Sequence, residues 1–171
     1  MTAARKVLML QGPSSGFFSR LGDALAARGA QGRRIHLCPG DALFWRRGGG
    51  ASWRGRPRDW PAWIAAWMAV EGITDLVLLG DRRPRHAAAI AAARGLGVRV
   101  HHAELGLLRP GRLTLEPDGP GARFPRDAAG VRALAARARD AGGPAAPAPG
   151  GAGFARYAAM DLTWNLANVA L

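Results

Sequence analysis

The sequence predicts an α/β fold built on an open sheet of parallel strands. Short apolar runs at residues 6–10 and 76–79 alternate with longer segments in which apolar residues recur at helical spacing. The clearest unit lies within residues 73–116, where the strand runs 76–79 and 98–100 flank an alanine-rich helix at 87–96. A strand, helix and strand of these lengths form a parallel crossover, and open sheets bind ligands at the carboxyl ends of such strands.

Length and composition favour one domain with a hydrophobic core. The chain has 171 residues, of which 49% are hydrophobic, and no apolar stretch approaches the roughly 20 residues that a membrane span needs. The single Cys38 excludes a disulfide framework within the chain and favours a reducing cytoplasm.

The formal net charge of +12 raises the question of nucleic-acid binding. Lys6 is the only lysine, and the arginines are spread along the chain without a nucleic-acid motif. We therefore predict no specific nucleic-acid partner. A field of this sign favours anionic partners such as nucleotide phosphates, acidic sugars or anionic lipid head groups.

The first predicted strand, 6–10, leads into a turn and then a helix at 17–28. The turn consists of Gln11, Gly12, Pro13, Ser14 and Ser15. Backbone donors at the start of such a helix can bind an anion, and an ordinary capped turn is the alternative. A second strand is expected at 34–37.

A long irregular segment is expected at residues 38–58, either functional or disordered. Phe44, Trp45 and Trp53 argue against plain disorder, and the glycine tip at 48–50 is expected to be mobile.

Asp59 is a suitable capping acceptor for the next helix, which Gly72 ends. The stripe on that helix predicts core packing, with a sugar-stacking surface as the alternative: Trp60, Trp63, Ile64, Trp67 and Met68.

The C-terminal third predicts a short strand or extended piece at 112–116 and a basic helix at 131–139. Residues 142–153, rich in Gly, Pro and Ala, predict a linker, and 154–171 has helical character. We expect a domain over 1–141, followed by the linker and the start of a helix leading to a C-terminal domain. On this interpretation the chain is a piece of a longer protein.

Four charged side chains are expected at the carboxyl edge of the sheet: Asp81, His86, Glu104 and Arg109. Glu104 follows a strand and precedes Gly106, so its carboxylate could exchange a proton with a substrate or simply pair with Arg109. Asp81 and His86 could orient one another, or Asp81 could cap the following helix. Arg109 could bind a phosphate or carboxylate, or lie on the surface.

Metal and serine-hydrolase chemistry have little support in the sequence. His101 and His102 are adjacent, so a strand would point them to opposite faces, and no second cysteine completes a zinc site. The serines, including Ser14 and Ser15, lie in no nucleophile-elbow context. We predict no metal and no resident cofactor.

Several separated blocks resemble one family, the capsule polysaccharide biosynthesis and export proteins of the KpsS/LipB type, which are similar to β-Kdo transferases. The blocks are Leu10-Gln11-Gly12-Pro13 with Phe17-Phe18, Gly40-Asp41 with Leu43-Phe44-Trp45, Trp53-Arg54-Gly55, residues 73–78, and Gly80-Asp81-Arg82 with His86. Residues 104–116 are the most specific block, close to the family's Glu-Glu-Gly-Tyr-Leu-Arg-Pro and Thr-Leu-Glu pattern.

The resemblance implies roles for individual residues. Glu104 corresponds to the first acid of the Glu-Glu-Gly signature, which implies a catalytic acid/base, and Gly106 and Arg109 to its glycine and its arginine. It also implies a substrate cleft lined by Gln11, Gly12, Pro13, Ser14, Ser15, Asp41, Asp81, Arg82 and His86. Leu105 departs from the pattern, because the family has a second acid there.

The resemblance implies the N-terminal, Rossmann-like, doubly wound half of a two-domain GT-B-like glycosyltransferase. Such an enzyme would transfer Kdo from the donor CMP-Kdo to an anionic glycolipid with a phosphatidylglycerol anchor. The implied setting is the cytoplasm, with peripheral contact at the inner membrane and with other capsule assembly proteins. The alternative is a non-catalytic component of capsule export that binds glycan or lipid, or serves as a scaffold.

Overall fold

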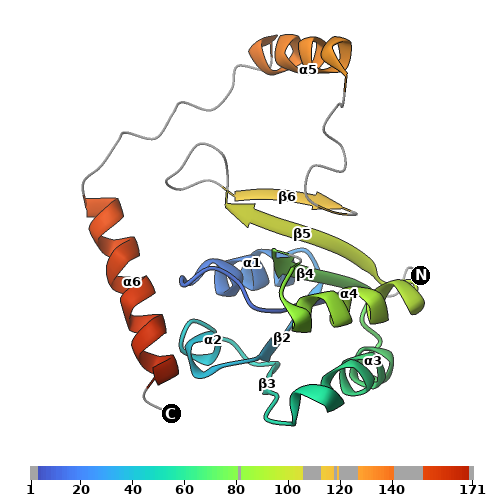
Figure 1. The fold of residues 1–171 in the computed structure, drawn as a ribbon, viewed down its shortest axis with the longest axis vertical. Coiled ribbons are helices and arrows are strands. Elements are labelled where there is room, and N and C mark those ends of the chain that lie inside the picture. Colours follow the sequence, from blue (N-terminus) through green and yellow to red (C-terminus); the bar gives the residue numbers. More distant parts are fainter. Residues whose placement is uncertain are drawn as a thin grey trace.

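The computed structural model of the chain describes residues 4–80, 82–105, 113–117, 119, 127–140 and 152–169. Its centre is a six-stranded sheet with the order β3-β2-β1-β4-β5-β6 (Figure 1). Neighbouring strands from β3 to β5 are parallel, and β6 is antiparallel to β5. The predicted α/β fold with a mostly parallel sheet is confirmed.

The elements follow one another along the chain with short connections in the first hundred residues. The strands are β1 Lys6–Met9, β2 Gln31–His36, β3 Gly50–Ser52, β4 Asp75–Leu79, β5 Arg99–Leu105 and β6 Leu113–Pro117. The helices are α1 Phe17–Ala26, α2 Pro39–Leu43, the 3-10 turn η1 Pro57–Asp59, α3 Trp60–Glu71, α4 Pro84–Gly95, α5 Ala128–Asp140 and α6 Ala152–Val169.

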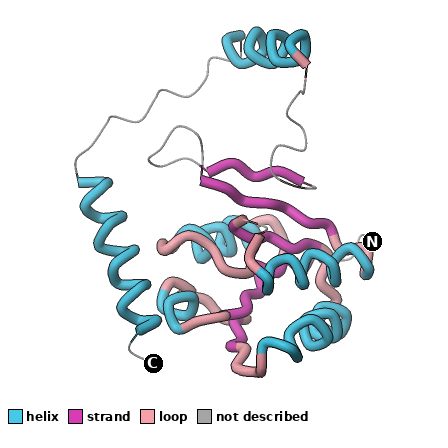
Figure 2. The backbone as a smooth tube through the Cα atoms, in the orientation of Figure 1, coloured by secondary structure: helices cyan, strands magenta, loops and turns pink. Residues whose placement is uncertain are grey.

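Apolar side chains cover both faces of the sheet, because successive residues of a strand point to opposite sides. On one face, Leu8 and Leu76 pack with Ile64 of α3 and Ile90 of α4. On the other face, residues such as Val7, Met9 and Val77 pack with Phe18 of α1. The sheet is therefore doubly wound, with its strands between layers of helix (Figure 2).

The tryptophan stripe of α3 forms part of the core, as predicted. Trp60 is 1% exposed, and its ring nitrogen donates a hydrogen bond of 2.8 Å to the Arg85 carbonyl. Trp63 and Trp67 are partly buried against the same cluster and stack with centroids 6.2 Å apart. Gly72 ends the helix in the left-handed conformation that glycine favours, at φ 64°.

Residues 38–58 are more regular than predicted. α2 begins at Pro39, shortly after β2 ends at His36, and Gly50 of the expected mobile tip starts β3 by pairing with Arg34. The sequence of β3, Gly-Ala-Ser, has no strand pattern. It forms a strand because it pairs with β2. The capping prediction for Asp59 is also wrong, since its side chain makes no capping bond and accepts one of 2.9 Å from Arg56.

A buried carboxylate holds the amino edge of the sheet. Asp75, at the start of β4, is 1% exposed. Its oxygens accept hydrogen bonds from Arg5 at 2.5 and 3.1 Å, Thr74 at 2.7 Å, His101 at 2.9 Å and Arg99 at 3.0 and 3.1 Å. Burial alone would raise the pKa of Asp75, but these hydrogen bonds outweigh burial and hold the pKa well below its ordinary value.

Replacing Asp75 with asparagine is expected to lower the free energy of unfolding by about 2–3 kcal/mol near neutral pH, because the bonded arginines lose their counter-charge. The loss is no larger because water screens the half-exposed arginines. The folded pKa is depressed, so the stability from ionised Asp75 is fully present above the unfolded pKa of about 3.9 and is lost as pH falls below it. Urea unfolding of both proteins between about pH 6 and about pH 3 should show the difference shrinking. A difference independent of pH would contradict this explanation.

Candidate functional site

A pocket of about 550 Å³ lies where the order of the strands reverses, between β1 and β4. Doubly wound sheets bind ligands at this position, beyond the carboxyl ends of the strands. Its lining comes from segments that follow β1, β2, β3 and β4: Gln11, Leu37, Cys38, Pro57, Trp60, Pro61, Arg83, Pro84, Arg85, His86 and Ala88. We call it the switch-point pocket.

Gln11 connects three of the segments around the switch-point pocket. Its carbonyl oxygen accepts a hydrogen bond of 3.2 Å from the backbone of Leu79 at the end of β4. Its side-chain oxygen accepts a hydrogen bond from Arg83, and its side-chain nitrogen lies 3.5 Å from the sulfur of Cys38. The loops after β1, β2 and β4 are therefore fixed to one another.

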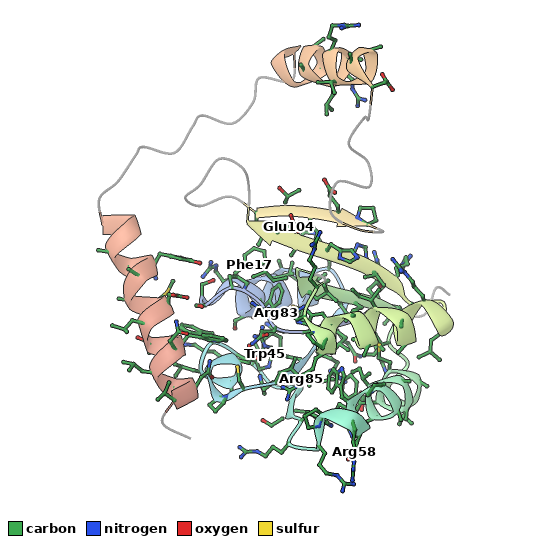
Figure 3. The ribbon with its side chains drawn as sticks, in the orientation of Figure 1. Phe17, Trp45, Arg58, Arg83, Arg85 and Glu104 are labelled. Carbon is green, nitrogen blue, oxygen red and sulfur yellow. The ribbon has the colours of Figure 1, made fainter. Side chains whose placement is uncertain are left out.

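The start of α4 supplies the positive charge of the pocket. Arg83 is exposed, whereas the guanidinium of Arg85 donates a hydrogen bond of 3.2 Å to the Leu37 carbonyl and lies 5.1 Å from the ring centroid of Trp53. Figure 3 shows both arginines at the beginning of α4. Guanidinium groups in this position can bind a carboxylate or a phosphate.

His86 and Cys38 complete the polar lining without providing an obvious nucleophile. His86 is fully buried, and its Nδ1 lies 2.8 Å from the Gly80 carbonyl, so the ring fixes the loop after β4. Burial raises the pKa of the Cys38 thiol above its ordinary value, and the carboxylate of Asp41 raises it further. The thiol therefore stays protonated at neutral pH and offers no thiolate nucleophile. The charged groups that remain in the lining are Arg83 and Arg85, which suit an anionic ligand.

Comparison with known proteins identifies the family of this chain. Residues 74–171 match the family described as "Capsule polysaccharide biosynthesis protein". The chain belongs to this family. The resemblance predicted from the sequence blocks is thus confirmed.

Two relatives of this capsule family member cover most of its length. It is 30% identical over 129 residues to the capsule polysaccharide export protein KpsS of Escherichia coli. The aligned region covers 74% of this chain and 33% of KpsS. It is 30% identical over 127 residues to the capsule polysaccharide modification protein LipB of Neisseria meningitidis, which is 73% of this chain and 30% of LipB. The chain spans about a third of the length of these relatives.

Among solved structures, a candidate UDP-N-acetylglucosamine 2-epimerase from Listeria monocytogenes aligns with a TM-score of 0.48 and 14% identity. The alignment covers 62% of this chain and 32% of that chain.

Of the predicted β1–α1 turn residues, Gln11 alone lines the switch-point pocket. Ser14 donates a hydrogen bond of 2.8 Å to Asp161 of α6, and Ser15 accepts one of 3.3 Å from the backbone of Phe17. Gly12 faces Phe18 so closely that a Cβ would lie 2.5 Å from the ring. Pro13 continues this turn. These residues hold the turn and α6 in place.

Asp41 has a structural position. It is 1% exposed, and its two oxygens accept hydrogen bonds from the Arg34 guanidinium at 3.2 Å and from the Leu37 backbone at 2.9 Å. Arg34 in turn lies 5.2 Å from the Phe18 ring centroid and 5.8 Å from that of Trp45. Asp41 does not line the switch-point pocket, and its carboxylate fixes the turn between β2 and α2.

Glu104 lies within β5, and not beyond the end of the strand as predicted. β5 extends to Leu105 because β6 pairs with it, with Thr114 opposite Glu104. The Gly80 backbone donates a hydrogen bond of 3.0 Å to Ala103, so Glu104 shares the carboxyl edge with the loop after β4. Its side chain is exposed on β5 (Figure 3) and does not line the switch-point pocket.

The remaining predicted site residues are only partly described. Asp81, Gly106 and Arg109 lie outside the described residues. Arg82 is exposed and is not part of the pocket lining.

Within the described ranges, no group of three His, Cys, Asp or Glu side chains could hold a metal ion. In the same part of the chain, no helix is long and apolar enough to cross a membrane.

Proposed function

We propose that this chain is the part of a capsule glycosyltransferase that binds an acidic sugar, in transfer of Kdo from CMP-Kdo to an anionic glycolipid. The observation that carries the proposal is the switch-point pocket with Arg83 and Arg85, in a chain that belongs to a capsule polysaccharide biosynthesis family. A sugar carboxylate suits these guanidinium groups. The apolar walls, including Pro57 and Pro61, can exclude water from the sugar ring.

In the proposed reaction, the bond between the anomeric carbon of Kdo and a phosphate oxygen of CMP breaks, and CMP leaves with the electron pair. A hydroxyl oxygen of the glycolipid forms the new bond to the same carbon and loses its proton. Glu104, on the carboxyl edge, is the proposed acceptor of that proton. Arg83 and Arg85 hold the carboxylate of the sugar, and Gln11 fixes Arg83 through its side-chain oxygen.

Replacing Arg83 with glutamine is expected to weaken the binding of free Kdo at least about tenfold, because a charge-assisted contact is lost. Isothermal titration with Kdo, and with glucose as a neutral sugar, measures the effect. The matched control is Arg58→Gln, which removes the same charge from an exposed arginine of η1 (Figure 3). Equal Kdo affinities for the two variants would show that Arg83 is not part of the site.

A second candidate function is binding of an acidic glycan without catalysis. The position of the Glu104 side chain, outside the lining of the switch-point pocket, favours it. On this alternative, Arg83→Gln weakens sugar binding as before, whereas Glu104→Gln changes neither binding nor any transfer.

A further inference from the structure

A second cavity of about 650 Å³ lies between α1, the segment after α2, and α6. It shares no lining residue with the switch-point pocket. Its lining is Ser15, Gly16, Ser19, Arg20, Asp23, Phe44, Arg46, Arg156 and Met160. We call it the α1–α6 cavity.

Three arginines from three different segments converge on this cavity. Arg20 belongs to α1, Arg46 to the loop after α2, and Arg156 to α6. Within the described part of the chain, none of the three forms an ion pair with a carboxylate. The only carboxylate in the lining, Asp23, is paired with Arg47. The cavity therefore has an excess of positive charge.

Two serines and the start of α1 add to the attraction for an anion. The oxygen of Ser19 accepts a backbone hydrogen bond of 3.4 Å from Arg46, which leaves the hydroxyl hydrogen for a ligand. Ser15 accepts one from Phe17 in the same way. The positive end of the α1 dipole lies at Gly16, which is also in the lining.

Specific contacts fix α6, and with it Arg156, against the rest of the cavity. Asp161 accepts the hydrogen bond from Ser14, and the side-chain oxygen of Asn168 accepts one of 2.9 Å from the backbone of Gly40. Trp164 lies so close to Gly40 that a Cβ there would be 2.5 Å from the indole ring. The arginines therefore converge because α6 is held against α2 and the turn before α1; Figure 1 shows α6 beside α2.

We propose that the α1–α6 cavity binds an organic phosphate. Guanidinium groups match the oxygens of a phosphate, and three of them can surround its two charges. The volume exceeds what a phosphate group alone needs, and Phe44 and Met160 provide an apolar wall for the attached organic group. The phosphate can come from a soluble ester or from a lipid head group, and the experiment separates these sources.

The test is titration of the 171-residue chain with phenyl phosphate, inorganic phosphate and phenol, followed by NMR. Phenyl phosphate should bind saturably and more tightly than inorganic phosphate, and phenol should not bind. The double variant Arg46→Gln/Arg156→Gln should bind phenyl phosphate at least about tenfold more weakly, through the loss of two charged contacts. The matched control is Arg28→Gln/Arg94→Gln, which removes two exposed arginines outside the cavity and should stay within about twofold.

Equal weakening in the two double variants would overturn the proposal, because net charge alone would then explain binding. Should the cavity double fail to show a cooperative thermal transition by circular dichroism, Arg156→Gln alone carries the comparison, since Arg156 is exposed on α6. Vesicles of phosphatidylglycerol and of phosphatidylcholine form the lipid arm. Binding that is specific for phosphatidylglycerol and depends on Arg156 supports a head-group phosphate, whereas equal vesicle binding without phenyl phosphate binding overturns the proposal.

This inference does not rest on Kdo transfer. Arg83→Gln, which tests the switch-point pocket, should leave the affinity for phenyl phosphate unchanged. A failure of sugar binding and a failure of phosphate binding are therefore separate results.

Discussion

Replacing Asp41 with asparagine is expected to lower the free energy of unfolding by about 3–5 kcal/mol. Asp41 and Arg34 are 1% and 3% exposed, so asparagine would leave a buried guanidinium without its counter-charge. Burial already lowers the pKa of Arg34, and the carboxylate of Asp41 opposes that effect. Asparagine has nearly the same size and can still accept the Leu37 hydrogen bond, so the loss reports the charge. Urea unfolding followed by circular dichroism measures it.

Two controls separate this ion pair from general effects of removing an acid. Asp59→Asn removes an aspartate that is 45% exposed and paired with Arg56, and should cost less than about 1 kcal/mol. Adding Arg34→Met to Asp41→Asn removes the stranded charge and should recover part of the lost stability. If the double variant is less stable than Asp41→Asn by the full cost of Arg34→Met alone, the two residues are not coupled.

Replacing Glu104 with glutamine is expected to reduce Kdo transfer at least about 100-fold, if Glu104 accepts the proton of the acceptor hydroxyl. Because the chain spans about a third of its relatives, the measurement uses a chimera with the part of KpsS that the match does not cover. Release of CMP from CMP-Kdo in the presence of the glycolipid acceptor gives the rate.

The matched control for Glu104→Gln is Glu71→Gln, which changes a glutamate at the opposite edge of the sheet, at the end of α3. It should leave transfer within about twofold of the parent chimera, since a surface ion pair with Arg33 contributes little. Undiminished transfer in Glu104→Gln would remove Glu104 from the mechanism. Retained sugar binding without transfer in the parent chimera would favour the binding-only alternative.

The strands and helices that carry strong local patterns could be predicted from the sequence. The apolar runs of β1 and β4 are examples, because both faces of these strands are buried and consecutive positions in the runs are therefore apolar. The tryptophan stripe of α3 is another, because one buried helix face requires apolar residues at helical spacing. β3 could not be predicted, since Gly-Ala-Ser becomes a strand only by pairing with β2. The extension of β5 through Glu104 likewise depends on its distant partner β6.

The position of the candidate site could be predicted better than its individual residues. The loop after β4 was expected at the carboxyl edge, and the pocket lies there, but Arg83 and Arg85 line it where Arg82 had been predicted. Which arginine faces the pocket depends on where α4 begins and on the turn of its first residues. The order of arginines in the sequence alone does not give this orientation. Asp41 was predicted to bind substrate, yet its buried partner Arg34 is visible only once β2 and α2 are folded.

The docking of α6 has a consequence for synthesis. Ser14 and its partner Asp161 are 147 residues apart, and Gly40 and Asn168 are 128 apart. Contacts of such long range form late, because the intervening chain must first be made and its ends brought together. The sheet can assemble before α6 has been made, but the α1–α6 cavity, with Arg156, is completed only after α6 has left the ribosome. The proposed phosphate site therefore forms later than the sheet.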